Sequence, residues 1–326
     1  MILNINSNAG SAQKVGSVGA VGKPAYDKHN NRVKGIFDTV VRKPEDLKTV
    51  FSQVAEVRKA NSQSTRTTFR AFVDRELIEN IRQDVLLSYH IEAVLPTNGS
   101  VQGCDLVYFG KNAPERKPAD YLRGEEERNL DNVRSNVKAV QPHVAKARAA
   151  NNGYTISLLE GTPSEGDVKT ILSLYKEAYE LYTFDINETT VSQLFSNGNK
   201  AIVARDSNNS IASMIISERC DLQLTDGSKV VMYEMSDFAT FRKDRGNGLI
   251  TALQIEMVKL LRRQEPDAVI YAEDRAPWLP VNKASAEAGL HYAGTLPFHC
   301  AIIADRDIDY SQNHQFESLN VWYAPF

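Results

Sequence analysis

The stretch MYEMSDFATFRKDRGNGLITALQIEMVKLL, residues 232–261, decides the fold. An apolar strand ends near Thr240, a short basic loop with Gly246 and Gly248 follows, and a long amphipathic helix begins at Leu249. Backbone N–H groups at the start of a helix have no partner inside it and carry partial positive charge. Glycine lets a ligand approach the backbone closely. The stretch therefore predicts a diphosphate site, with an ordinary surface-charged turn as the alternative.

The elements around this stretch predict a mixed α/β layer architecture. From residue 154 onward the patterns give a strand, two helices, three strands, the long helix, a strand, a short helix and two further strands. The glycine loop follows the fourth strand of a mostly antiparallel series. A Walker loop is absent, and RGNGLITA is not the fingerprint of an early Rossmann unit. We therefore expect a mixed, mostly antiparallel sheet flanked by helices.

Composition excludes several classes of protein. The chain has 326 residues, a net charge of −3 and 42% hydrophobic residues, which is ordinary for a globular protein of about two domains. Nothing in this balance favours a nucleic-acid or membrane partner. We find no signal peptide, so we expect a cytoplasmic location. Three cysteines and six histidines show no metal-ligand spacing, so no metal is assigned. The sequence leaves the oligomeric state open, with a homodimer as one alternative.

Three segments organise the chain. Residues 1–112 are expected to form an N-terminal α/β domain with a flexible start, residues 113–150 a charged linker that is partly helical, and residues 151–326 the second domain. HIEAVLP at 90–96 echoes HYAGTLP at 291–297, which indicates a half-repeat. We expect the sequence before TTFRAFVD, residues 67–74, to contain no strand that carries a carboxylate as the strand of Glu234 does. The first half is then expected to wall a substrate cleft without binding the diphosphate itself.

This order of elements and this loop resemble the GNAT superfamily of acetyl-CoA-dependent N-acetyltransferases. Their signature loop is (Q/R)xxGxG or (Q/R)xxGxA, and here Lys243 stands at its first position. NKASAEAGL at 282–290 resembles the fourth-helix motif, with a serine where many members have a tyrosine acid. The resemblance spans about residues 153–305 and implies acetyl-CoA as cosubstrate. It implies coenzyme contacts from Phe238, Ala239, Thr240, Lys243, Asp244, Arg245, Gly246, Asn247, Gly248, Asn282 and Ser285.

A second resemblance extends over nearly the whole chain. HIEAVLPTNGSVQGCDLVYFGK, LYKEAYELYTFDI, YEMSDFAT, AGTLPF and ESLNVWY are similar to stretches of the β-lysine N-acetyltransferases, which are GNAT enzymes with an extra N-terminal portion. This resemblance implies a small amino-acid-like acceptor, β-lysine or a lysine-like amine. It adds an N-terminal partial GNAT-like domain to the expected fold.

Amide formation needs a base, because an alkyl ammonium has a pKa of about 10.4 and must lose a proton before it attacks a thioester. Glu234 lies in an apolar strand, where a carboxylate is unusual, and at the position where many GNAT enzymes carry their base. The alternative is a structural carboxylate. Strict alternation would put Glu234, Ser236 and Phe238 on one face of the strand. In this fold a backbone N–H within 238–240 would serve the developing oxyanion.

The acceptor would be selected by side chains beside the cleft. Glu218 is the candidate for the second amine of a diamino acid, and the aromatic candidates are Tyr182, Phe184 and Trp322. The function expected from these observations is acetyl transfer to a small amine by direct attack. The alternatives are a polyamine or protein lysine or N-terminal acetyltransferase, and a non-catalytic sensor of acetyl-CoA or an amino acid.

Overall fold

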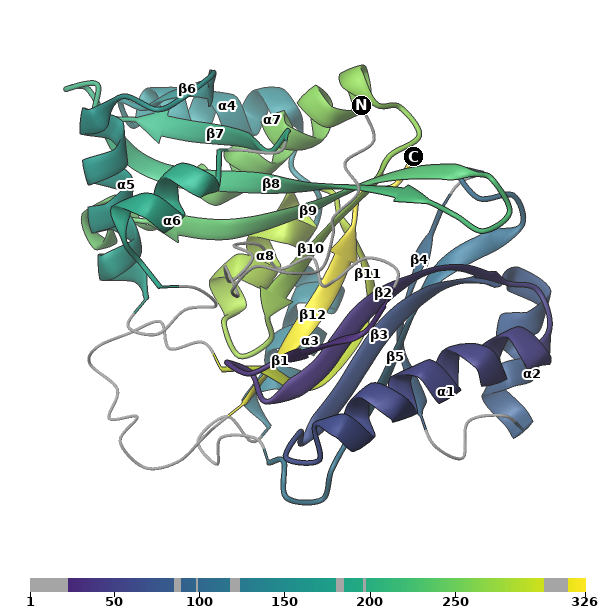
Figure 1. The fold of residues 1–326 in the computed structure, drawn as a ribbon. Coiled ribbons are helices and arrows are strands. Elements are labelled where there is room, and N and C mark those ends of the chain that lie inside the picture. The colour runs from purple at the N-terminus through teal and green to yellow at the C-terminus, as the bar shows by residue number, and fades with distance from the viewer. Residues whose placement is uncertain are drawn as a thin grey trace.

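One sheet runs through most of the chain (Figure 1). The computed structural model describes residues 23–84, 89–97, 99–117, 124–179, 185–195, 198–301 and 316–326; the expected flexible start, residues 1–22, lies outside them. The strands within these ranges form a 12-stranded sheet in the order β1-β2-β3-β5-β4-β11-β12-β10-β9-β8-β7-β6. Only β2–β3 and β9–β10 are parallel among its described pairs. The expected mixed, mostly antiparallel sheet flanked by helices is confirmed.

Five of the described strands lie in the first half of the sheet and seven in the second, on either side of the β4–β11 pair. The first half holds β1 (Ala25–Asp27), β2 (Arg32–Val41), β3 (Arg66–Asp74), β4 (His90–Pro96) and β5 (Cys104–Asn112), with β6 (Thr155–Leu159) opening the second part of the chain. The remaining strands are β7 (Lys200–Arg205), β8 (Ile211–Gln223), β9 (Lys229–Thr240), β10 (Val269–Arg275), β11 (His291–Cys300) and β12 (Glu317–Tyr323).

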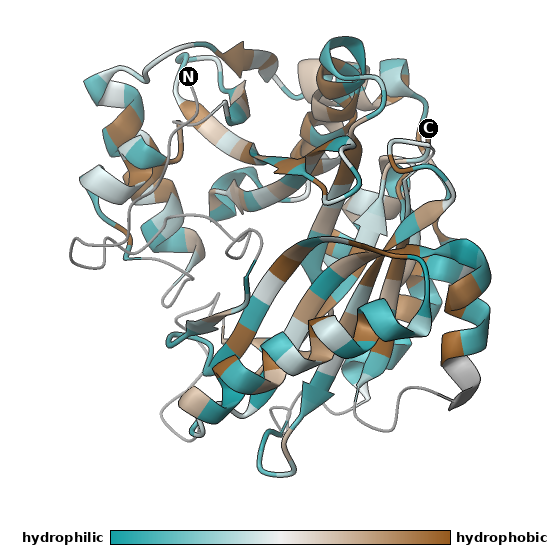
Figure 2. Cartoon of the chain, turned by 45° about the vertical axis from the view of Figure 1, so that its right-hand side comes forward, coloured by the Kyte–Doolittle hydropathy of each residue, from teal (hydrophilic) through white to brown (hydrophobic). Residues whose placement is uncertain are grey.

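Helices cover the sheet on both faces. They are α1 (Pro44–Ala60), α2 (Arg75–Asp84), α3 (Glu125–Asn136), α4 (Pro142–Asn151), α5 (Glu165–Ala178), α6 (Glu188–Gln193), α7 (Leu249–Gln264) and α8 (Leu279–Glu287). Apolar residues concentrate on the strands, whereas the helices alternate between apolar and polar positions (Figure 2). Helices α3 and α4, which lie in the expected charged linker, bury Val133, Ala145 and Ala149 against the second half. Within the described residues no helix is long and apolar enough to span a membrane.

The two halves of the sheet repeat one topology. The series β2-α1-β3-α2-β4-β5 matches β9-α7-β10-α8-β11-β12, and each begins with a parallel pair followed by antiparallel strands. The halves meet where β4 pairs with β11 through Ala93 and Gly294. These two residues are 201 positions apart, as are His90 and His291 of the sequence echo. Equivalent residues therefore face each other where the two halves join.

The expectation that no comparable strand precedes the repeat is wrong. Strand β2 runs parallel to β3 from the Arg32–Arg66 pair to the Val41–Val73 pair and carries a carboxylate at Asp38. Its polar start hides it in the sequence, because Arg32 and Lys34 are buried cations in positions where a strand pattern calls for apolar residues.

The expected face alternation of β9 is also wrong after Ser236. Between the pairs Ile216–Ser236 and Met214–Ala239, β9 uses one residue more than β8, and Asp237 takes a positive φ of 55°. Such a bulge reverses the side-chain alternation beyond it. Phe238 therefore packs with the α7 cluster and not on the face of Glu234.

Candidate active site

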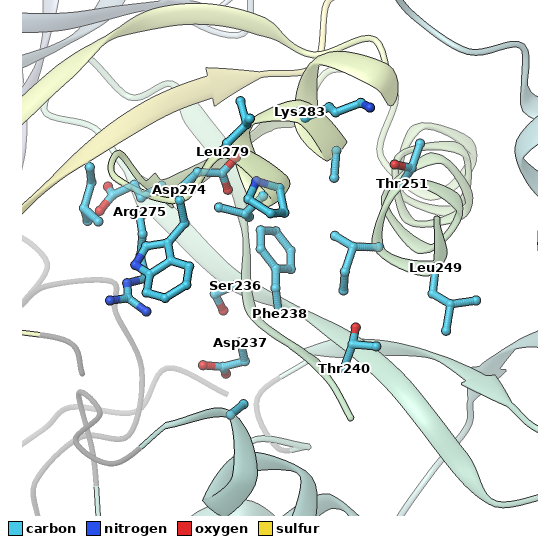
Figure 3. A pocket seen from close by; sticks show the side chains of 18 of the residues that line it. Ser236, Asp237, Phe238, Thr240, Leu249, Thr251, Asp274, Arg275, Leu279 and Lys283 are labelled. Atoms are coloured by element: carbon cyan, nitrogen blue, oxygen red, sulfur yellow. The ribbon is translucent and has the colours of Figure 1, made fainter. Parts of the chain in front are cut away.

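A cavity of about 630 Å³ opens where β9 and β10 diverge. Their parallel pairing ends at Met235 and Ala272. Beyond that point the strands separate, and Figure 3 shows Ser236, Asp237 and Phe238 of β9 across the pocket from Asp274 and Arg275 of β10. Because the gap interrupts the sheet, one cavity is lined by residues from both of its faces.

The two faces of the sheet bring different groups to this cavity. On one, which we call the α7 face, Tyr233, Met235, Ile270 and Ala272 pack in the cluster of α7. On the other, which we call the Glu234 face, side chains of the second half pack against the inner face of β2, β3 and β5. The first half of the chain therefore forms a wall of the cavity on the Glu234 face.

On the α7 face, the N-terminus of α7 faces the cavity. Gly248 occupies the N-cap position with φ 71° and has no side chain to accept a hydrogen bond from the first N–H groups. The first turn of the helix holds no acidic residue. The first three helical residues, 249–251, all line the cavity. Their N–H groups are the donors that a helix leaves unsatisfied. A Cβ built on Gly246, at φ 84°, would meet nothing within 4 Å. These features fit an anionic group such as a diphosphate.

Two arginines add positive charge at the same end of the cavity. Arg245 belongs to the predicted loop, whereas Arg148 comes from α4 and lies close enough to Gly248 that a Cβ there would meet its Cδ at 2.9 Å. Asp244 accepts a hydrogen bond from Tyr154 at 2.8 Å, and Asn247 donates to the Asp244 carbonyl at 2.9 Å. These two residues hold the loop in its conformation.

Glu234 is buried on the opposite face, with 3% of its surface exposed. Burial, together with the neighbouring carboxylates of Glu273 and Glu218, raises its pKa to about 7 against the opposing charges of Lys34 and Arg70. Tyr271 donates a hydrogen bond of 2.9 Å to the Glu234 carboxylate. A carboxyl group with a pKa near neutrality is suited to accept and release protons during turnover.

The first half positions the groups around Glu234. Arg70 of β3 donates to the Tyr271 hydroxyl at 2.6 Å and to the Tyr108 hydroxyl at 3.3 Å. Because each hydroxyl proton is then free to point elsewhere, Tyr271 donates to Glu234 and Tyr108 donates to Glu273 at 3.2 Å. One buried guanidinium thus orients two tyrosines, and each tyrosine holds one carboxylate.

The Glu234 face of the cavity carries both signs of charge. Glu218 is the direct cross-strand partner of Glu234 and accepts a hydrogen bond of 2.9 Å from Ser236. Arg32 and Lys34 of β2 line the same cavity. Burial, followed by the charge of Arg32, lowers the pKa of Lys34.

His299 is neutral in this setting. Burial lowers its pKa well below the usual value, and Arg32 and Arg66 lower it further.

The structure brings eight of the sixteen predicted site residues to the cavity. They are Glu234, Glu218, Phe238, Thr240, Asp244, Arg245, Gly246 and Gly248. Six others lie elsewhere. Ala239 packs against α5, Lys243 is exposed, Asn247 braces the loop, and Asn282 and Ser285 are buried residues of α8. Trp322 is 2% exposed and donates to Asn282 at 3.2 Å. Tyr182 and Phe184 lie outside the described residues.

Sequence reasoning missed the residues that distant parts of the chain contribute. Arg32, Lys34 and Arg148 line the cavity although no local motif marks them. Arg148 lies in the charged segment 113–150, and that charge was the only feature of the sequence that could have drawn attention to it. Charged segments of this kind more often form solvated surface than a binding site. Glu273 and Asp274 follow the apolar run of β10, just as Glu234 lies within the apolar run of β9. Carboxylates in a buried strand are unusual, so these two residues could have been predicted as site residues in the same way as Glu234.

No family model matches the chain, and no curated protein does. Solved structures that resemble it include NAA60 of Arabidopsis thaliana in complex with a bisubstrate analogue, at 12% identity and a TM-score of 0.40, over 52% of this chain and 97% of that one. A GCN5-related N-acetyltransferase from Kribbella flavida has 17% identity and a TM-score of 0.41, over 54% and 99%. Spermidine N-acetyltransferase SpeG of Vibrio cholerae, in a mutant form, has 13% identity and a TM-score of 0.38, over 53% and 93%.

Proposed function

We propose that the protein transfers the acetyl group of acetyl-CoA to the primary amine of a small amino-acid-like acceptor, β-lysine or a lysine-like diamino acid. One observation carries this proposal. A single cavity connects an uncapped helix N-terminus on the α7 face with a carboxylate of pKa about 7 on the other face. Acetyl transfer from a nucleotide thioester uses an anion site for the diphosphate and a base for the attacking ammonium.

In this proposal the α7 face receives the coenzyme. The N–H groups of residues 249–251 and the side chains of Arg148 and Arg245 would bind its diphosphate. The first turn of α8, where Leu279 and Pro280 line the cavity, would lie along its pantetheine arm. The N–H groups of β9 beyond Met235, where pairing with β10 has ended, would stabilise charge on the thioester oxygen.

The Glu234 face receives the amine. Glu234 would accept the ammonium proton, so that the nitrogen lone pair can attack the thioester carbon. A diamino acid carries a second ammonium and a carboxylate, and the cavity offers Glu218 and Glu273 for the first and Lys34 and Arg32 for the second. A polyamine has no carboxylate, so these two cations would repel it. The charge pattern therefore favours an amino acid over a polyamine.

The test is a screen for thiol release from acetyl-CoA by the full chain. Lysine, β-lysine and ornithine are expected to release thiol, and spermidine and short peptides are expected to be poor acceptors. Stoichiometric binding of acetyl-CoA without amine-dependent thiol release would instead identify a sensor. Release with spermidine alone would contradict the amino-acid acceptor but keep the acetyltransferase.

A variant of the first half sharpens the screen. Lys34→Met is expected to raise KM for the diamino acid about tenfold, because one charged contact to the acceptor carboxylate is lost. Cadaverine, which is lysine without its carboxylate, is the matched acceptor and should not lose affinity for the variant. An equal rise for both acceptors would mean that Lys34 acts only through the fold.

A further inference from the structure

Asp274 is a buried carboxyl group that the scheme above leaves unused. It is the sixth residue of β10, 1% exposed, and it lines the cavity opposite the diverging end of β9 (Figure 3). Its Oδ2 accepts a hydrogen bond of 2.5 Å from Ser285 of α8. Its Oδ1 has no hydrogen-bond partner among the described residues. A polar atom this deeply buried without a partner is rare and calls for a ligand or a proton.

The location of Asp274 separates it from Glu234. Along β10, Ile270 and Ala272 pack in the α7 cluster and Tyr271 lies on the Glu234 face. Because side chains alternate along a strand, Asp274 lies on the α7 face. Its hydrogen bond to Ser285, from α8, agrees with that side. The two carboxyl groups therefore line one cavity from opposite faces of the sheet.

The separation of the two carboxyl groups suggests a role for Asp274, and this inference rests on the proposed function. The anion site at α7 puts the coenzyme on the α7 face, so the sulfur of the thioester arrives from the side of Asp274. The amine arrives from the side of Glu234. We propose that Asp274 is the general acid of the reaction, a neutral carboxyl group whose free oxygen delivers a proton to the departing thiolate.

The proton balance of this step closes. The C–N bond forms, the C–S bond breaks, and sulfur keeps the bonding electron pair and takes the proton of Asp274. The two protons that nitrogen loses pass through Glu234 to solvent, one before the attack and one after it. Asp274 regains one proton from solvent. Each turnover releases one proton.

The electrostatics of the group agree with this role. Burial raises the pKa of Asp274 to about 8, although the hydrogen bond from Ser285 opposes the shift. The carboxyl group is therefore protonated at neutral pH. Its pKa is close to that of a free thiol, about 8.5, and a general acid works best when its pKa is near the operating pH.

The experiment compares pH profiles of the full chain with a diamino acid as acceptor. The wild type is expected to lose activity above about pH 8, where Asp274 ionises. Asp274→Asn keeps the shape and the hydrogen bond to Ser285 but has no proton to transfer. It is expected to turn over about 10²-fold more slowly and to lack this basic limb, with unchanged coenzyme A affinity by calorimetry. Asp267→Asn, an exposed carboxylate before β10, is the matched control.

A second variant moves the limb without removing the acid. Ser285→Ala deletes the hydrogen bond that holds the pKa of Asp274 down, so the basic limb should shift to higher pH. Infrared difference spectra of wild type minus Asp274→Asn should show a protonated carboxyl band at pH 7. The pH profile of Ser285→Ala decides the matter even if Asp274→Asn folds poorly.

The outcomes separate the two proposals. An active wild type whose basic limb persists in Asp274→Asn, or stays in place in Ser285→Ala, overturns the assignment of Asp274 alone. Absence of the protonated carboxyl band overturns it as well. A wild type that binds acetyl-CoA but releases no thiol with any amine overturns the proposed function, and the acid falls with it.

Discussion

The first half of the sheet, β2-α1-β3-α2-β4-β5, and the second half, β9-α7-β10-α8-β11-β12, have the same order of elements but begin their first helix differently. At α1, Asp46 accepts hydrogen bonds from the N–H groups of Arg42 and Lys43, at 3.0 and 3.2 Å. At α7, Gly248 is the N-cap without a side-chain bond, and no acidic residue follows in the first turn. One helix start is closed by its own carboxylate, and the other is open to an anion.

The parallel pairs differ as well. After an irregularity, β2 resumes its pairing with β3 at Val40–Phe72 and Val41–Val73. Strand β9 does not resume its pairing with β10 after Met235–Ala272. Two local features, the missing acidic cap and the shorter stretch of parallel pairing, distinguish the second half, where the strands open into the cavity, from the first half, where they stay paired.

The largest effect is expected at Glu234. Glu234→Gln should cut turnover by about 10²–10⁴-fold, the usual contribution of a general base, while calorimetry with coenzyme A shows unchanged affinity. The base works when deprotonated, so wild-type kcat/KM should rise as pH passes through about 7, and the variant should lose this acidic limb. Glu165→Gln, an exposed carboxylate on α5, is the control. Full activity of Glu234→Gln at pH 7 would remove Glu234 from the mechanism.

The glycine loop should give the next largest effect. Valine at Gly246 or Gly248 would adopt a positive φ, which costs about 1–3 kcal/mol. The loop would relax away from its anion-binding conformation, and coenzyme A affinity should fall by about 10- to 100-fold. Gly161→Val, which has the same strain at φ 69° in open space outside the cavity, tests whether the strain alone matters. Equal affinities in all three variants would exclude this loop from coenzyme binding.

The helix start of α7 can be made to resemble that of α1. Thr251 is the third residue of α7, as Asp46 is the third of α1. Thr251→Asp puts a negative charge where the diphosphate would lie, and coenzyme A affinity should fall about tenfold, or about 1.4 kcal/mol. Thr251→Asn has the same size without the charge and should bind nearly as the wild type does. If the two variants bound coenzyme A equally, the open helix start would not be the anion site.

The sequence predicted the parts of the site that lie close together in the chain. The strand of Glu234, the glycine loop and the helix after it are continuous, so their pattern predicted the helix start that lines the cavity and the buried carboxylate. The bulge at Asp237 could not be predicted from the sequence. It exists only as a mismatch in the pairing of two strands, where β9 uses one residue more than β8 between two paired positions. Arg32 and Lys34 reach the cavity because the two halves of the sheet pair at Ala93 and Gly294. No local pattern contains that pairing.

A smaller effect should follow from the tyrosines that Arg70 orients. Tyr271→Phe removes a hydroxyl that donates to the Glu234 carboxylate. A hydrogen bond to a charged group is worth about 1.5–3 kcal/mol, so the pKa of Glu234 should rise by about one unit or more. The acidic limb of kcat/KM should move to higher pH. Tyr108→Phe removes the equivalent bond to Glu273 and should leave the limb nearly in place. Equal shifts would show that the two tyrosines act only through packing.

The smallest effect is expected at the closed helix start of the first half. Asp46→Ala removes the acceptor of two backbone N–H groups and a negative charge near the N-terminus of α1, and should lower the free energy of unfolding by about 1 kcal/mol. Denaturant unfolding measures the loss. Calorimetry with coenzyme A should find the same affinity and one site per chain, because β2 and β3 stay paired beyond the helix start and leave no gap for a thioester. A second coenzyme site appearing in Asp46→Ala would mean that the cap alone keeps the first half from binding. Coenzyme binding would then not require the interrupted pairing that separates β9 from β10.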